Sequence, residues 1–387
     1  MNICIDYTTV EDLERDIGAY TGAGSFTRDL ILSLKDQGAE LKFLVHKGFV
    51  PSKKTEKELM SDESALIRTA DITDLTFSKG DILLLPAVTG RILDKISRIR
   101  KKNADLLIYA FIHDRQHNIG RFDPMDRFFY YGMRRFLPVL YAEYLIKKLA
   151  YNCHYPGWIG SVDKVFTVSN HTLQALSHKN LKHITYFYQP SWVSGCVPEK
   201  PQGADETGDY ILFVSGGRPE KNLGRALPAF RDFCTATDTD SRLCVTGIKR
   251  EKLYHIASDL KIEQTFIDSR VISYDYVDTG ELAYLYNNCR YLLFLSKGEG
   301  FGLPILEAVL SGRTVLCSRQ SANPEVAGSI LYYVDAYDTA SIRDGMLYLD
   351  DDRNLKYREE LVAKKKKIIE EQIGLDRQVL IREIVGE

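Results

Sequence analysis

Short β-branched and aromatic runs alternate with helical segments along most of the chain, and this alternation constrains the fold more than any other feature. Strands that alternate with helices form βαβ units, whose strands are parallel because each helix returns the chain to the same edge of the sheet. The sequence therefore predicts an α/β protein with parallel sheets. The runs expected to be strands are residues 2–6, 41–46, 81–85, 106–112, 164–168, 184–188, 210–214, 242–246, 271–274, 291–295, 314–317 and 331–334.

The alternation pauses across residues 191–209, where prolines and glycines lie among polar residues. Such a stretch is typical of a linker between domains. A chain of 387 residues is also long enough for two cores of ordinary domain size. After about Thr339 the chain is expected to be helical to its end. We expect one domain over residues 1–200, a second over 201–365, and a helical segment over 366–387 that packs back on the first domain.

The charge of the chain disfavours a nucleic-acid partner, and its hydropathy disfavours a membrane-spanning helix. The formal net charge is −2, with 27% charged residues, and this lacks the basic excess of nucleic-acid binders. No run approaches the roughly 20 apolar residues of a membrane-spanning helix, and the start of the chain does not resemble a signal peptide. We expect no nucleic-acid partner and a cytoplasmic protein, with peripheral contact at the inner membrane face left open.

The cysteines and aspartate pairs do not suggest a metal site. The chain has 7 cysteines, which are scattered without the spacing of metal ligands and are expected to be reduced. Asp238-Thr-Asp240 and Asp350-Asp-Asp352 have the form Asp-x-Asp, but both lie in polar stretches near helix ends rather than after a buried strand. We expect neither to bind a metal.

Residues 291–312 read as a buried strand, a glycine-rich turn and a helix that begins near Pro304. Gly298, Gly300 and Gly302 permit close backbone approach, and the free N–H groups of the helix point into the same space. A diphosphate is the expected ligand there. Glu299 and Glu307 supply acceptor oxygens that suit the hydroxyl groups of a sugar and a ribose. The alternative is that Glu299 caps the helix and Glu307 pairs with a lysine.

A second constellation follows the strand at residues 210–214. Arg218 and Lys221 lie in Ser215-Gly-Gly-Arg-Pro-Glu-Lys-Asn222, at the carboxyl end of that strand, where α/β proteins bind ligands. Two cations at this place can neutralise a departing nucleoside diphosphate without a metal ion. The alternative is a surface turn with exposed basic residues.

These motifs resemble those of the retaining glycosyltransferases of family 4. The family's Glu-x7-Glu motif is matched by Glu299-Gly-Phe-Gly-Leu-Pro-Ile-Leu-Glu307, and its Gly-Arg-x-x-Lys-Asn element by Gly217-Arg-Pro-Glu-Lys-Asn222. The segment from Pro324 to Asp335 also resembles the family. The resemblance implies a GT-B architecture, with two facing Rossmann-like domains, parallel sheets and an interdomain cleft.

The resemblance also implies a role for each site residue. Arg218 and Lys221, next to Gly217, would hold the diphosphate, Glu307 the ribose and Glu299 the donor sugar. The backbone of Gly300, Phe301, Gly302 and Leu303 would meet the sugar and β-phosphate. Tyr276 and Val277 occupy the position that meets the base, although the following Asp278-Thr-Gly-Glu281 also reads as a plain helix cap.

The first half supplies the remaining candidates. Gly22 and Gly24 resemble the family's glycine-rich loop, which would admit the β-phosphate and the acceptor. A nicotinamide-binding loop would need a third glycine directly after the first strand, and its absence disfavours a dehydrogenase. His113, at the end of the strand over 106–112, matches a family histidine near the donor sugar. A histidine satisfied within a strand-end network is the alternative.

Residues 122–155 are rich in aromatic and basic side chains, which suits acceptor recognition or membrane contact. A buried helix with a basic edge is the alternative.

Together these features predict a retaining transferase that moves a sugar, of mannosyl or glucosyl type, from a nucleotide-sugar donor to a glycan or lipid-linked acceptor. No cofactor or metal is expected. The candidate catalytic residues are Glu299, His113, Arg218 and Lys221. A non-catalytic nucleotide-sugar-binding subunit on the same fold remains the alternative.

Overall fold

The computed structural model divides the chain into two compact units. The first contains Met1–Arg115, Leu149–Pro190 and Gln372–Glu387, and the second contains Gln116–Lys148 and Ser191–Glu371. The residues that the structure describes are 2–8, 11, 22–51, 55–56, 59–60, 63–88, 90–113, 121–176, 184–186, 195–204, 209–237 and 239–386.

The first unit is built on a seven-stranded parallel sheet of order β3-β2-β1-β4-β5-β6-β7. The two central strands β1 and β4 are buried along their whole length, as parallel strands are when helices cover both faces. The strands are β1 (Ile3–Asp6), β2 (Leu41–His46), β3 (Leu66–Thr69), β4 (Ile82–Leu85), β5 (Leu107–Ile112), β6 (Lys164–Thr167) and β7 (Ile184–Tyr186). The helices are α2 (Gly22–Asp36), α4 (Gly90–Lys102) and α7 (Asn170–Leu176), with the 3-10 helices η1 (Glu63–Ala65) and η2 (Ile72–Asp74).

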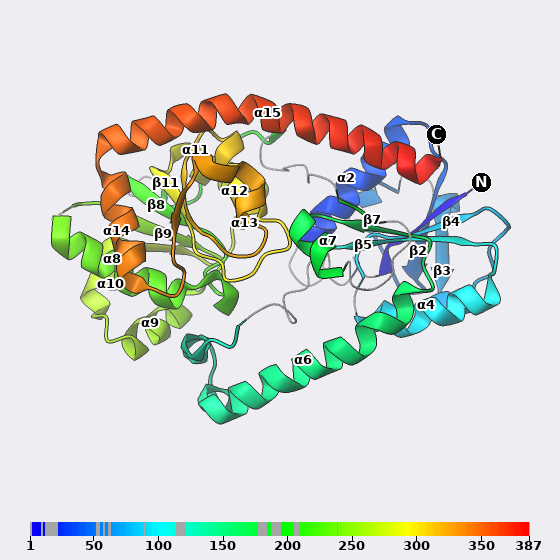
Figure 1. Cartoon of the computed structure of the whole chain (residues 1–387), viewed down its shortest axis with the longest axis horizontal. Helices are drawn as coiled ribbons and strands as arrows, with labels where there is room; N and C mark the ends of the chain where they lie inside the picture. Colours follow the sequence, from blue (N-terminus) through cyan, green and yellow to red (C-terminus); the bar gives the residue numbers. More distant parts are fainter. Residues whose placement is uncertain are drawn as a thin grey trace. The chain divides into compact units, whose positions relative to one another are not determined.

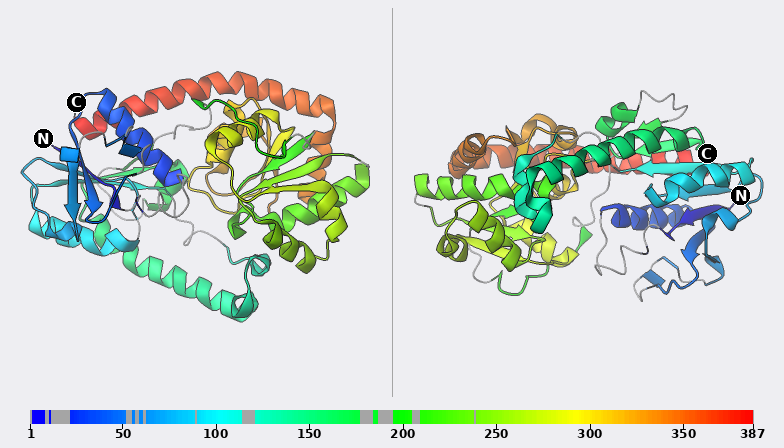
Figure 2. Two further views of the ribbon diagram at one scale, coloured as in Figure 1. Left: turned by 180° about the vertical axis from the view of Figure 1, so that it is seen from behind. Right: turned by 90° about the horizontal axis from the view of Figure 1, so that it is seen from below.

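The second unit has a six-stranded parallel sheet of order β10-β9-β8-β11-β12-β13, with helices on both of its faces (Figure 2). The strands are β8 (Tyr210–Phe213), β9 (Arg242–Thr246), β10 (Val271–Tyr274), β11 (Tyr291–Phe294), β12 (Val315–Ser318) and β13 (Tyr332–Val334). The helices are η8 (Pro219–Lys221), α8 (Leu223–Thr237), α9 (Arg250–Asp259), α10 (Gln264–Arg270), α11 (Thr279–Asn288), α12 (Leu303–Leu310), α13 (Asn323–Ala327), η9 (Gly328–Ile330) and α14 (Thr339–Asp350), most of them labelled in Figure 1.

The strand order of the second sheet reverses between β8 and β11. The chain runs from β8 outward to β9 and β10, then returns to add β11 on the other side of β8. In open α/β sheets such a reversal separates the loops at the carboxyl ends of the two strands and opens a crevice that binds ligands. The loops that follow β8 and β11 are therefore the expected place for a ligand in this unit.

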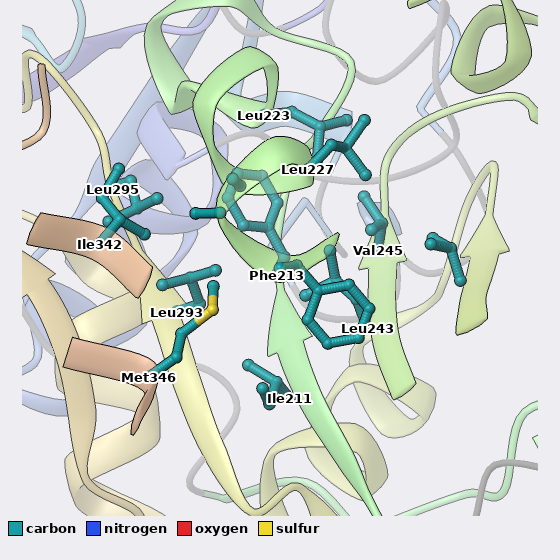
Figure 3. Close-up of a cluster of buried hydrophobic side chains, with 14 of the residues drawn as sticks. Ile211, Phe213, Leu223, Leu227, Leu243, Val245, Leu293, Leu295, Ile342 and Met346 are labelled. Carbon is teal, nitrogen blue, oxygen red and sulfur yellow. The ribbon is translucent and has the colours of Figure 1, made fainter. Parts of the chain in front are cut away.

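The core beneath these loops is apolar and holds both strands in place. Side chains of β8, β9 and β11 pack against α8 and α14, which also contact each other (Figure 3). Burial of apolar side chains in such a core is the main contribution to the stability of the unit. The labelled members are Ile211, Phe213, Leu223, Leu227, Leu243, Val245, Leu293, Leu295, Ile342 and Met346.

The division into units differs from the expected limit of the first domain. Residues 116–148, placed in the first domain by the sequence, group with the second unit, because η3 (Pro124–Phe129) packs on α8, α9 and η8. The helix α6 (Leu137–Ile159) contributes to both units, as does α15 (Asp352–Val385). The end of α15 contacts the first unit through Arg377, which pairs with Asp29 at 3.0 Å.

All the strands expected from the sequence are present, within two residues at each end, and β3 is the strand that the sequence analysis missed. β3 is a four-residue edge strand with partly exposed side chains, so it lacks the buried apolar pattern of the others. The helical end of the chain is interrupted at Asp351, between α14 and α15. None of the helices in the described part of the chain is both long enough and apolar enough to span a bilayer.

Candidate active site

Two loops meet at the reversal point of the second sheet. We call residues 215–222, after β8, the basic turn, and residues 296–302, after β11, the glycine loop. β8 and β11 pair in parallel, so both loops leave the same edge. The backbone N–H of Lys297 donates to the carbonyl of Glu220 at 2.8 Å, and Ser296 Oγ donates to the same carbonyl at 3.3 Å. The two loops are therefore joined directly.

The basic turn has a tightly constrained backbone. A Cβ atom on Gly217 would lie 2.4 Å from the carbonyl oxygen of Gly247, so only glycine fits there. Asn222 ends the turn with φ of +71°, and its side chain donates to the carbonyl of Ala336 at 2.7 Å. This hydrogen bond compensates for a left-handed conformation that asparagine tolerates better than most residues.

Lys221 forms an ion pair with Glu299 that links the basic turn to the glycine loop. Lys221 Nζ donates to Glu299 Oε1, and the two side chains are only 4% and 11% exposed. Burial lowers the pKa of Lys221, and the Glu299 carboxylate opposes that shift. The alternative of an exposed basic residue in a surface turn is wrong for Lys221, because the ion pair draws the ammonium group inward.

Arg218 differs from Lys221 in exposure. Its side chain is 54% exposed, and its Nε atom pairs with Glu220 at 3.1 Å. Exposed ion pairs contribute little to stability, typically about 0–1 kcal/mol. The guanidinium group can therefore turn to a ligand phosphate at small cost, whereas Lys221 can contact a phosphate only from within the ion pair.

The glycine loop leads into the amino-terminal end of α12. The backbone N–H of Glu299 donates to Ser321 Oγ at 2.7 Å, which fixes the loop against the segment after β12. Gly302 caps α12 with φ of +110°, and Pro304 lies in the first turn. A positive φ of this size favours glycine. No side chain of the described residues caps the helix, so its positive dipole end faces the loop.

Glu307, in the second turn of α12, is buried beneath the glycine loop. Burial raises the pKa of Glu307 to about 7, although the nearby Tyr286 hydroxyl and Lys221 act in the opposite direction. Tyr286 on α11 is itself fully buried. A buried carboxylate that is costly to ionise is well suited to accept hydrogen bonds from a ligand that enters the site.

Replacing Glu307 by glutamine is therefore expected to stabilise the unliganded protein above pH 7. The folded-state pKa lies above the unfolded one, so stability falls as the pH rises from about 4.5 to 7 and stays lower beyond that. Removing the ionisation should raise the free energy of unfolding by about 1–3 kcal/mol at pH 8 and by less at pH 5. Denaturant unfolding at both pH values measures this, with the exposed Glu371→Gln as control. Equal effects at pH 5 and pH 8 would contradict the buried, neutralised carboxyl group.

The candidate base-binding residues follow β10. Tyr276 is half exposed, and Val277 is partly buried. Asp278 forms a capping box with Glu281 at the start of α11, with hydrogen bonds of 2.8 and 2.9 Å. The helix-cap interpretation of Asp278 is thus confirmed. A contact between Tyr276 and a base stays a prediction.

Three candidates lie in the first unit. His113 follows β5; its Nε2 donates to the carbonyl of Pro86 at 2.8 Å, and its ring packs edge-on against Phe26 at 4.9 Å. These contacts fit the alternative stated for His113, a histidine whose ring is satisfied by neighbours at the end of a strand. Gly22 and Gly24 lie in the first turn of α2 rather than in a loop before it. Asp114, which follows His113 in the chain, lies outside the described residues.

Two aspartates beside the glycine loop were missed by the sequence analysis. Asp123 and Asp126, at the start of η3, both bind Lys297 Nζ, with 2.7 Å from Asp123 Oδ2. The sequence signal was weak, because these residues lie in an aromatic and basic stretch and their partner is far away in the chain. Two aspartates of the Asp-x-Asp sequences pair with arginines: Asp240 with Arg270 and Asp352 with Arg290, whereas Asp238 lies outside the described residues.

The second half of the chain matches a known family. Residues 199–368 match the family described as Glycosyl transferases group 1. The O-antigen chain mannosyltransferase B of Escherichia coli is 29% identical over 169 residues, which are 43% of this chain and 43% of that protein. The serotype-specific mannosyltransferase WbdA of Escherichia coli is 37% identical over 137 residues, 35% of this chain and 17% of that protein. The matched part thus spans less than half the length of these relatives.

The likeness to solved structures extends over the whole chain. A UDP-forming α,α-trehalose-phosphate synthase from Burkholderia xenovorans, solved with glucose-6-phosphate, superposes with a TM-score of 0.66. It is 10% identical, and the match covers 99% of this chain and 100% of that one. At this identity the likeness shows the fold. The fold is GT-B, with two Rossmann-like units, as the sequence predicted, and its second unit carries the match to group 1 glycosyltransferases.

Proposed function

We propose that the protein is a retaining glycosyltransferase that moves a sugar from a nucleoside-diphosphate donor to a hydroxyl group of a glycan or lipid-linked acceptor. The observation that carries the proposal is the cluster of Arg218, Lys221, Glu299 and Glu307 at the reversal point of the second sheet. A ligand with a diphosphate and two hydroxyl-bearing rings would satisfy its cations and its carboxylates together. Because the matched relatives in Escherichia coli are named mannosyltransferases, a mannosyl donor is the first choice.

Each group of the cluster has a distinct task in this proposal. Arg218 binds the diphosphate from the exposed side of the basic turn, and Lys221 binds it from inside the ion pair. The amino-terminal end of α12, with the backbone from Gly300 to Leu303, binds the β-phosphate and the sugar, as helix ends bind anions. Glu307 accepts from the ribose hydroxyl groups, Glu299 accepts from the donor sugar, and Tyr276 with Val277 meets the base.

The proposed reaction keeps the anomeric configuration. The bond between the anomeric carbon and the β-phosphate oxygen breaks, and the acceptor oxygen bonds to that carbon from the same face. The acceptor proton passes to the leaving phosphate oxygen, so no side chain of the cluster is required as a nucleophile. Arg218, Lys221 and the amides at the start of α12 stabilise the negative charge that develops on the diphosphate. His113, Gly22 and Gly24 are proposed to complete the donor and acceptor sites.

We further propose that the reaction needs no metal ion, because these cations and the helix end supply the positive charge. Transfer is expected to continue unchanged in excess chelator. The measurement is the rate of nucleoside diphosphate release with chelator and after dialysis into metal-free buffer. Loss of turnover that manganese or magnesium restores would contradict the proposal.

The acceptor side is proposed to include contact with an anionic membrane surface. Large apolar side chains are exposed along η4 (Gly132–Arg135) and α6, among basic residues of the same segment. Aromatic and basic residues together suit the headgroup region of a bilayer. The exposed apolar residues are Tyr131, Met133, Phe136, Tyr141, Leu145 and Ile146.

The protein should therefore sediment with vesicles that contain anionic lipid and remain in solution with neutral vesicles. Met133→Ser combined with Ile146→Ser should weaken this binding several-fold, because about 0.8 kcal/mol is lost for each buried methylene group. Ile368→Ser, which changes an exposed residue of α15, serves as control. Equal recovery with both vesicle types would count against membrane contact.

A non-catalytic nucleotide-sugar-binding subunit is the alternative. It would bind the donor through the same cluster but would neither transfer nor hydrolyse it. Release of nucleoside diphosphate that depends on an acceptor separates the two proposals.

A further inference from the structure

One buried carboxylate contacts both halves of the candidate donor site. Asp123, 1% exposed, accepts from Arg225 Nη1 at 2.6 Å and from Arg225 Nη2 at 2.9 Å. Its Oδ2 atom also accepts from Lys297 Nζ at 2.7 Å. Both cationic side chains are largely buried themselves, at 12% and 8% exposed.

One of the two cations lies in the glycine loop, and the other lies shortly after the basic turn. Arg225 lies in the first turn of α8, three residues after Asn222, and its Nη1 also donates to Asn222 Oδ1 at 3.1 Å. Asn222 ends the basic turn and is the direct neighbour of Lys221. Lys297 lies in the glycine loop, two residues before Glu299, and its backbone binds Glu220. Asp123 is therefore connected to both partners of the Lys221–Glu299 ion pair.

The electrostatics favour an ionised carboxylate at this place. Burial alone would raise the pKa of Asp123, but Arg225 and Lys297 hold it well below the usual range. Asp126 pairs with Lys297 but not with Arg225, and burial raises the pKa of Asp126. Of these two carboxylates, Asp123 is the one that binds both Arg225 and Lys297.

We infer that Asp123 is a positioning residue that holds the basic turn and the glycine loop in register for the nucleotide-sugar donor. The expected effect of Asp123 on sugar transfer rests on the proposed function, whereas its expected effect on the two loops does not. Without the Asp123 charge, Arg225 would lose its carboxylate partner and Lys297 would keep Asp126, and breaking a buried pair in this way is costly. The loops would then separate, and Lys221 and Glu299 would move away from the positions that the donor requires.

The test compares Asp123→Asn, which keeps the side-chain shape, with Asp126→Asn and with Arg231→Gln. Arg231 lies on the same helix α8 but pairs with its exposed neighbour Asp232. Amide hydrogen exchange is measured over residues 215–222 and 296–302, and donor KM, acceptor KM and kcat are measured at a temperature where each variant is fully folded.

For Asp123→Asn we expect faster exchange in both loops and a donor KM about tenfold higher, with the acceptor KM unchanged, because small misplacements of binding groups are costly. Asp126→Asn should loosen the glycine loop alone and change the donor KM less than about threefold, and Arg231→Gln should change neither. A merely structural role predicts that the fully folded variant keeps wild-type exchange in both loops and unchanged KM values, and this result would overturn the inference.

The exchange measurement separates this inference from the proposed function. Unchanged exchange in both loops of Asp123→Asn would overturn the positioning role even in an active enzyme. Faster exchange in both loops would support it even if no nucleotide sugar bound. If Asp123→Asn folds poorly, the double variant Asp123→Asn/Lys297→Met removes one of the two buried cations. If the double variant recovers stability while its donor KM stays raised, the positioning role of Asp123 is supported. If stability and donor KM both return to the wild-type values, the positioning role is overturned.

Discussion

Replacing Glu299 by glutamine is expected to lower kcat for sugar transfer by about 10- to 1,000-fold, or roughly 1.4–4 kcal/mol in activation free energy. The donor sugar gains positive charge as its bond to the phosphate breaks. A carboxylate that contacts the sugar is therefore worth more in the transition state than in the ground state. Glutamine keeps the hydrogen-bonding shape of Glu299 but not its charge.

The same variant should still bind free nucleoside diphosphate, and at least as tightly as the wild type. Glu299 competes with the diphosphate for the ammonium group of Lys221, because the two side chains form an ion pair. Neutral glutamine removes that competition. Calorimetry with the diphosphate and steady-state kinetics with the intact donor measure the two effects. If Glu299→Gln abolished diphosphate binding while Glu307→Gln preserved it, the roles assigned to the two glutamates would be reversed.

The second large effect separates the two cations of the basic turn. Arg218→Ala should reduce transfer by about 100-fold or more, a size typical of a lost group that stabilises transition-state charge, with little change in stability. Lys221→Ala should reduce transfer as well, but it should also lower the free energy of unfolding by about 3–5 kcal/mol. It leaves Glu299 buried without its cation, and removing one partner of a buried pair is strongly destabilising.

Denaturant unfolding at pH 7.5 and donor kinetics, run on both variants, measure this difference. Lys221→Met combined with Glu299→Gln is the control, because it removes both charges and should recover much of the lost stability without recovering transfer. Equal stability of Arg218→Ala and Lys221→Ala would show that the ion pair is not buried in solution. Unchanged donor kinetics in both would place the cations outside the site.

The sequence predicted the parallel sheets and most strands because buried parallel strands leave a clear pattern of consecutive apolar residues. Tyr291–Phe294, for example, is buried throughout and is followed directly by the glycine loop. The same reasoning placed Arg218 and Glu299 at the carboxyl ends of strands. It could not show that β8 and β11 are neighbours, since strand order depends on long-range pairing rather than on local pattern.

The sequence could not predict the ion pairs of the site for a similar reason. Lys221 and Glu299 are 78 residues apart, and Asp123 and Lys297 are 174 apart. No local spacing connects such partners, so the sequence indicated neither the burial of Lys221 nor a role for Asp123. The limits of the first domain were affected too, because residues 121–148 lie between β5 and β6 of the first sheet in the chain but group with the second unit.

The most direct test of the central claim is a calorimetric titration of UDP-, GDP- and ADP-sugars into the wild-type protein and into Arg218→Ala. We predict that one nucleotide class binds the wild type. The variant should bind the same ligand at least tenfold more weakly, which is about 1.4 kcal/mol. Absence of binding by all three classes, or equal affinity in the wild type and the variant, would contradict a nucleotide-sugar site at the reversal point of the second sheet.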